Sequence, residues 1–106
     1  MVKAAVLDQR HLRSIPEADW QEGVRQHALL RGWLFFHPWS AKHSAAGYPD
    51  CTMVRRSRLI FAELKRVGEV PTPEQVVWLE ALRGVPGVEV YVWTVADRDE
   101  VERVLA

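Results

Sequence analysis

The chain has 106 residues, 48% of them apolar and 26% charged, which suits one soluble globular domain with a single core and leaves too little for two. No apolar run approaches the roughly 20 residues that cross a bilayer, and the first residues lack the long apolar stretch of a secretory signal. The only cysteine, Cys51, excludes an internal disulfide framework and is typical of a reducing, cytoplasmic environment.

Charge is unevenly distributed along the chain, although the formal net charge is zero. Residues 31–66 carry seven Lys and Arg against two acids, residues 67–106 carry three against eight, and residues 1–30 balance at four each. A basic middle can follow phosphate groups while an acidic end stays solvated. Chance clustering in a short chain explains the same counts, so charge alone does not decide whether the partner is a nucleic acid.

Residues 1–13 show no clear pattern and are interpreted as an N-terminal arm, either loose or forming a short extra element. The remaining residues, 14–106, are expected to form one domain. Its first predicted element is a helix with Ser14 as N-cap, Pro16 in the first turn and Gly32 after the end. Apolar residues recur at every fourth position of this helix, so one stripe faces the core: Trp20, Val24 and Ala28.

Strands are predicted at residues 33–37, 51–55, 58–65 and 88–93, where β-branched and aromatic residues are enriched. A closing helix is predicted over residues 97–106. A further helix is predicted between the last two strands, with Thr72 as N-cap, Pro73 at the first position and Gly84 after the end. One face of this helix carries Gln75, Trp78, Leu79 and Leu82. The order α-β-β-β-α-β-α favours an α/β fold with a mixed sheet flanked by helices.

Two acids bracket the predicted pair of strands in the middle of the chain. A two-residue turn at Arg56 and Ser57 would place Asp50 directly across from Glu63. Facing residues point to the same side of a sheet with Cβ atoms roughly 5 Å apart. Lys65 shares that face because it follows Glu63 by two positions. This geometry depends on the turn length, since a shift of one residue moves Asp50 to the opposite face.

Two carboxylates that close repel each other unless a proton or a cation lies between them. A hard divalent ion such as Mg²⁺ takes oxygen ligands, keeps several waters and neutralises charge that develops on a phosphate. Asp50, Glu63 and the backbone carbonyl of Leu64 are candidate ligands, and Lys65 would orient a water or stabilise the reacting phosphorus. The alternative is structural: Asp50 is a strand-entry turn residue after Pro49, and Glu63 and Lys65 are a solvated strand end.

Other polar residues near these strands have two interpretations as well. Glu17 should point inward from the first helix, but it also completes an S-x-x-E capping box with Ser14. Gln75 likewise completes T-x-x-Q with Thr72. His37 either enters the site or packs as a lone histidine. The histidines share no ligand spacing with one another or with the cysteine, so we do not expect a zinc site.

Basic and aromatic side chains near the acids offer contacts to nucleic acid. The arginines at the turn, Arg55, Arg56 and Arg58, are either solvated or in contact with phosphate. Trp39, in the loop before Asp50, could stack on a base, whereas the other tryptophans are expected in the core. Cys51 is expected to be a small buried core residue.

The segment "GYPD", followed by a hairpin and "ELK", resembles the signature of the PD-(D/E)xK nucleases. Its surroundings narrow the resemblance to the VRR-Nuc branch, in its small stand-alone phage or bacterial form: "EADWQEGVRQHALLRGWLFFH", "SAAGYPD", "RLIFAELK", "TPEQVVWLEAL" and "VEVYVW". The resemblance runs from about Glu17 to the C-terminus. Cys51 and Thr52 depart from a more usual aliphatic pair, and no catalytic position is lost.

The resemblance implies a restriction-endonuclease-like fold and a role for each matching residue. The implied catalytic residues are Lys65, Asp50, Glu63, Glu17 and Gln75, and the implied ligands of Mg²⁺ or Mn²⁺ are Asp50, Glu63, Glu17 and the carbonyl of Leu64. Ser44 matches a serine usual in the loop before the first acid. DNA contacts are expected from Lys42, Ser44, Trp39, Arg55, Arg56 and Arg66.

The resulting hypothesis is a metal-dependent DNA endonuclease that hydrolyses phosphodiester bonds and leaves a 5′-phosphate and a 3′-hydroxyl. Small stand-alone members resemble Holliday-junction resolvases, so we expect a homodimer acting on branched or duplex DNA in recombination, repair or replication. The expected location is the cytoplasm of a bacterium or of a phage-infected host. Two alternatives stay open: a nuclease that a partner protein targets, and a nucleic-acid-binding module that does not cleave.

Overall fold

The structure, a computed structural model, describes residues 10–38 and 45–106, and the strands in these ranges form one open mixed sheet in the order β1-β2-β3-β4. The strands are β1 (Leu34–Phe36), β2 (Cys51–Arg55), β3 (Arg58–Leu64) and β4 (Val88–Trp93). β1, β2 and β3 are antiparallel neighbours, whereas β4 runs parallel to β3. The expectation of an α/β fold with a mixed sheet and helices is therefore confirmed.

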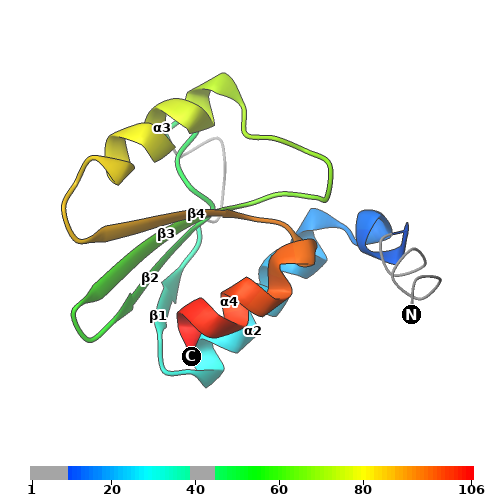
Figure 1. The fold of residues 1–106 in the computed structure, drawn as a ribbon, viewed down its shortest axis with the longest axis horizontal. Coiled ribbons are helices and arrows are strands. Elements are labelled where there is room, and N and C mark those ends of the chain that lie inside the picture. The colour runs from blue at the N-terminus through cyan, green and yellow to red at the C-terminus, as the bar shows by residue number, and fades with distance from the viewer. Residues whose placement is uncertain (1–9, 39–44) are drawn as a thin grey trace.

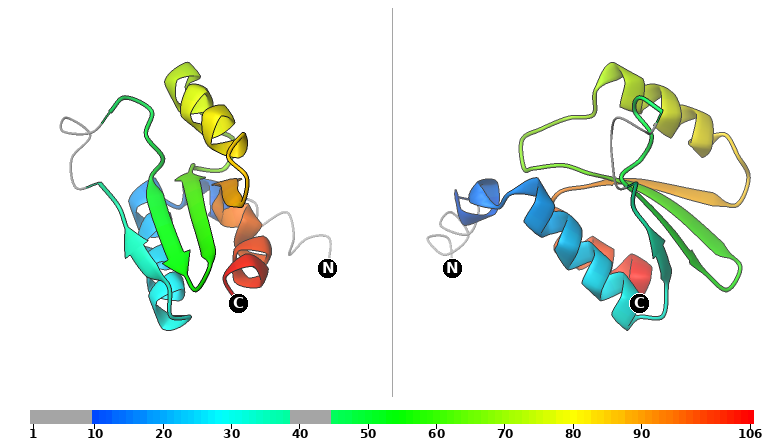
Figure 2. Two further views of the ribbon diagram at one scale, coloured as in Figure 1. Left: turned by 90° about the vertical axis from the view of Figure 1, so that its left-hand side faces the viewer. Right: turned by 180° about the vertical axis from the view of Figure 1, so that it is seen from behind.

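Helices cover both faces of the sheet (Figures 1 and 2). α2 (Glu17–Leu30) and α4 (Arg98–Leu105) lie side by side on one face, and α3 (Pro73–Arg83) lies on the other. Residues 10–14 are also helical, and a 3-10 helix, η2 (Val95–Asp97), leads from β4 into α4. No helix in the described ranges has the length and apolar character needed to cross a membrane.

α2 begins later than the sequence predicted. Its N-cap is Pro16, whose side chain offers no capping hydrogen bond, and Glu17 is the first helical residue. Ser14 is not the cap, because its Oγ donates a 2.6 Å hydrogen bond back to the carbonyl of His11 in the preceding helical turn. The predicted S-x-x-E capping box is therefore wrong, and Glu17 has no capping role. The predicted apolar stripe of α2 is confirmed by the burial of its members Trp20, Val24 and Ala28.

α3 has the predicted N-terminus. The Gln75 N–H donates to Thr72 Oγ1 at 3.2 Å, and the Thr72 N–H donates to Gln75 Oε1 at 2.8 Å, so both hydrogen bonds of the capping box are present. Pro73 occupies the first turn, where its missing N–H costs nothing, and Gly84 is the C-cap. Leu79 is buried where α3 packs on β4, so the predicted apolar face of α3 is the one that meets the sheet.

The β2–β3 hairpin has the predicted register. Arg55 pairs with Arg58 and Cys51 pairs with Ala62, so the intervening turn has two residues, and its first residue, Arg56, has φ +56°. Positive φ is what a two-residue hairpin turn of the favoured hand requires. Continuing this register by one pair places Asp50 across from Glu63, as the sequence predicted.

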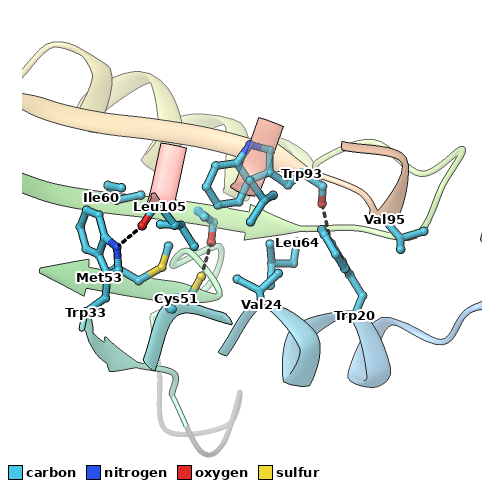
Figure 3. Packing of buried hydrophobic residues seen from close by; sticks show 13 residues of the cluster. Trp20, Val24, Trp33, Cys51, Met53, Ile60, Leu64, Trp93, Val95 and Leu105 are labelled. Atoms are coloured by element: carbon cyan, nitrogen blue, oxygen red, sulfur yellow. Dashed lines mark hydrogen bonds between the residues drawn. The ribbon is translucent and has the colours of Figure 1, made fainter. Parts of the chain in front are cut away.

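The core lies between the sheet and the α2–α4 layer (Figure 3). Burying side chains such as Met53 and Ile60, which are 0% exposed, contributes about 1.5–3 kcal/mol each to folding. Cys51 is buried here as expected. Two indoles in this layer donate hydrogen bonds: Trp20 Nε1 to the carbonyl of Trp93 at 3.1 Å, and Trp33 Nε1 to the carbonyl of Leu105 at 2.9 Å. Because hydrogen bonds are directional, these two orient α2 against β4 and α4 against the segment before β1, in addition to the apolar contacts.

Candidate functional site

Asp50 is held where the loop "GYPD" enters β2. Its Oδ2 accepts a 2.7 Å hydrogen bond from the backbone N–H of Leu64 on the neighbouring strand. This bond points the carboxylate toward the peptide group between Glu63 and Leu64. Pro49 is buried beside it, so the backbone that leads into Asp50 is fixed by packing. Asp50 is consequently part of the β2–β3 junction and not a freely solvated turn residue.

Glu63 is a buried carboxyl group with an unusual environment. Its side chain is 1% exposed, and neither Oε1 nor Oε2 has a hydrogen-bond partner among the described residues. Burial raises the pKa of Glu63 well above its ordinary value, contact with the Asp50 carboxyl raises it further, and Lys65 opposes both. Two acceptors in contact need a proton or a cation between them. The interpretation of Glu63 as a solvated strand end is therefore wrong.

Lys65 and Glu17 complete a charged cluster with these two acids. Lys65 is only 8% exposed, and its backbone N–H donates to the carbonyl of Trp93 at 2.9 Å. Burial raises the pKa of Glu17, the negative charge of Asp50 adds to the rise, and the Lys65 ammonium lowers it. The structure thus brings Glu17, Asp50, Glu63 and Lys65 close enough to influence one another electrostatically.

The carbonyl of Trp93 links the helix that bears Glu17 to Lys65, the residue that follows β3. It accepts the Lys65 backbone N–H and the Trp20 indole N–H together. Trp20 lies one helical turn after Glu17, so this shared acceptor fixes the first turn of α2 against the end of β3. Sequence reasoning placed Trp20 in the core but had no signal for this hydrogen bond, because the acceptor lies 73 residues away in the chain.

Gly47, the first residue of "GYPD", lies where the structure requires glycine. Its φ is +81°, and a Cβ added there would lie 2.4 Å from the backbone carbon and oxygen of Glu74. Only glycine tolerates both the conformation and the close approach. The contact places the "GYPD" loop against the first turn of α3, where Gln75 is half-buried. Because Gln75 Oε1 already accepts the Thr72 N–H, its catalytic role stays a prediction.

The residues predicted to contact DNA fall into three groups, of which Arg55 alone forms the third. Trp39, Lys42 and Ser44 lie outside the described residues. Arg56, in the hairpin turn, and Arg66, just after the "ELK" segment, are exposed, and an Arg66 Nη2 donates to the carbonyl of Arg13 at 3.2 Å.

Arg55 lies at the far end of β2 from Asp50, about 16 Å away by the rise of a strand. Its guanidinium donates to the carbonyls of Arg31, Leu105 and Ala106 and lies 4.6 Å above the Trp33 ring. In this position it ties β2 to the end of α4. Its contact with DNA stays a prediction.

The donor set suits a hard divalent ion held by few protein ligands. No group of three or more His, Cys, Asp or Glu side chains within residues 10–38 and 45–106 is arranged to hold a metal. Mg²⁺ commonly binds through one or two carboxylates and keeps several waters. The two Glu63 oxygens, buried without donors beside Asp50, fit such an ion, because a cation would replace the missing hydrogen bonds.

The cluster lies outside a cavity that other described residues form. That cavity, of about 290 Å³, lies between α2 and α4 and is lined largely by apolar side chains, among them Trp20 and Val24. None of the four clustered charged residues lines it.

Comparisons of the chain with protein-family models, with curated proteins and with solved structures gave no match. The geometry of the cluster and the sequence motif are therefore what indicate a function.

Proposed function

We propose that this chain is a metal-dependent DNA endonuclease of the PD-(D/E)xK type, with the restriction-endonuclease-like fold of the VRR-Nuc branch. The observation that carries the proposal is the buried Glu63 carboxyl, which has no donor for either oxygen and lies against a second carboxyl on the adjacent strand. Such a pair costs stability, and a divalent cation between the two groups would offset that cost. The buried Lys65 beside it matches the third element of the motif.

In this proposal Asp50 and Glu63 hold Mg²⁺ or Mn²⁺, together with the Leu64 carbonyl, and Glu17 completes the acidic cluster. The bound ion supplies an activated water and neutralises charge on the phosphate. The Leu64 N–H holds the Asp50 carboxylate in place for this task. Lys65 supplies a buried positive charge that stabilises the negative charge developing on the oxygens of the reacting phosphate.

The proposed substrate is branched or duplex DNA, and the proposed working form is a homodimer in the cytoplasm. Two identical sites are needed to cut paired strands, and the described part of each chain contains one such cluster. Residues 31–66, which include both acids of the motif, carry seven Lys and Arg against two acids, and this excess of positive charge would attract the phosphate backbone.

Cleavage assays with a four-way junction, a flap and a linear duplex test the proposal in the presence of Mn²⁺ or Mg²⁺. We expect metal-dependent cleavage by the wild-type protein and loss by at least about a hundredfold in Asp50→Ala and Lys65→Ala. If the wild type and both variants behave alike, the nuclease function is wrong. DNA binding without cleavage would then support the non-cleaving module, and cleavage that appears only with a second protein would support a targeted nuclease.

A further inference from the structure

His37 contacts Asp50 from the edge of the sheet. It follows the last residue of β1, and its Nδ1 lies 2.5 Å from the backbone carbonyl oxygen of Asp50. A carbonyl oxygen only accepts, so Nδ1 must carry the proton. In the neutral ring Nε2 then has the lone pair, on a side chain that is exposed.

This contact continues the sheet beyond its last backbone pair. Phe36 pairs with Thr52, the final pair between β1 and β2 in this direction. One residue further on, the His37 ring donates to the main chain at Asp50 in place of a backbone N–H. A side chain therefore holds the peptide from which the Asp50 carboxylate extends.

Asp50 is consequently held at two points, one from the residue just after β1 and one from β3. His37, next to β1, holds its main-chain carbonyl, and the Leu64 N–H of β3 holds its Oδ2. With only one of these contacts, the carboxylate could rotate with its peptide and move away from Glu63. The two contacts together restrict both ends of the residue.

We propose that His37 is a positioning residue that holds Asp50 in the orientation in which it faces Glu63. The inference rests on the proposed function in so far as it concerns metal binding, but the hold on Asp50 exists without metal. In this proposal the atom that holds Asp50 is Nδ1, the inner ring nitrogen of His37. Groups around a metal ligand that orient it typically change metal affinity by about 10–100-fold when removed.

Two substitutions separate the inner ring nitrogen from the outer one. In His37→Asn the amide nitrogen can occupy the position of Nδ1, because both are bonded to Cγ. In His37→Gln the amide is one bond further out and corresponds to Nε2. His37→Ala removes both. The Asn and Gln variants are matched in polarity, so a difference between them reports on position alone.

The first measurement is amide hydrogen exchange by NMR in the metal-free protein. We expect the Leu64 amide to exchange about tenfold faster in His37→Ala and His37→Gln, the effect of one lost hydrogen bond, and within about twofold of wild type in His37→Asn. The Ile60 amide, in the middle of the same strand, should be unchanged. An unchanged Leu64 rate in His37→Ala, or an equal change at Ile60, would overturn the proposal.

The second measurement is the affinity for Mn²⁺ by calorimetric titration, with Asp50→Ala as the control without a site. We expect about tenfold weaker binding in His37→Ala and His37→Gln, and near wild-type binding in His37→Asn. Better retention in Gln than in Asn would assign the role to the outer nitrogen and overturn the proposal. If wild type itself binds no Mn²⁺, the proposed function fails, and the exchange measurement still decides the role of His37.

Discussion

Glu63 occupies a position where a neutral side chain would make the fold more stable. Its carboxyl group is buried, lacks a hydrogen-bond donor among the described residues and contacts a second acid. Its pKa is raised from an ordinary value of 4.5, so the folded state holds this proton more tightly than the unfolded state does. The stability that comes from the protonated form is complete below pH 4.5 and is lost as the pH rises through the folded pKa.

We therefore expect Glu63→Gln to stabilise the metal-free protein and to abolish cleavage. At pH 8 with a chelator present, the Tm of the variant should exceed that of wild type by about 5 °C or more, because a Gln amide can donate to the Asp50 carboxylate. The gap should shrink as the pH falls toward 4.5. Thermal unfolding from pH 4.5 to 8 measures both quantities. A wild-type protein as stable as the variant at pH 8 would contradict the assigned environment.

At the scale of elements, α2 is joined to the site through one acceptor, the Trp93 carbonyl. Trp20→Phe keeps most of the buried ring and deletes the indole N–H. Trp33→Phe is a matched control, since Trp33 also donates a buried indole N–H to a backbone carbonyl, that of Leu105 at the far end of the core (Figure 3).

Both substitutions should cost on the order of 1–3 kcal/mol of stability, but only Trp20→Phe should impair cleavage strongly. We expect kcat/KM to fall about tenfold for Trp20→Phe and less than about threefold for Trp33→Phe. The measurement is made well below the Tm of either variant. Equal losses in the two variants would show that Trp20 acts through general stability alone.

The sequence predicted the elements whose causes are local. The hairpin register follows from a two-residue turn, and the α3 cap follows from Thr72 and Gln75 three residues apart. The start of α2 was misassigned because Ser14 has two nearby backbone partners, and residue types alone do not show which one it takes. The bonds to Asp50 from His37 and to Trp93 from Trp20 depend on how distant segments pack, so no local pattern predicts them.

At the scale of the whole molecule, the sheet leaves apolar residues exposed at its β1 edge. Leu34 is 73% exposed, and Val54, its partner on β2, is 37% exposed. A stable interface usually buries roughly 800 Å² on each partner. The proposed homodimer would gain from covering this corner, because exposed edge strands are also the usual sites of strand pairing between chains.

We expect wild-type protein at micromolar concentration to have twice the 12.2 kDa mass of one chain, and Leu34→Asp to be monomeric. Val77→Asp is the control, because Val77 is 68% exposed on α3, away from β1. Light scattering coupled to gel filtration measures the mass. A monomeric wild-type protein would remove the basis for the dimer, and dissociation by both variants would place the interface elsewhere.

The β2–β3 hairpin has a consequence for the order in which the cluster assembles. Asp50 and Glu63 are 13 residues apart and are joined by a short turn, whereas Glu17 is 33 residues from Asp50. Hairpins close in about 1–10 μs, and contacts across longer loops have a higher entropic cost. We expect the folding transition state to contain the hairpin and to lack a docked α2, so Val54→Ala should slow folding, while Val24→Ala should mainly speed unfolding. The like charges would then meet before the Glu17 helix has docked.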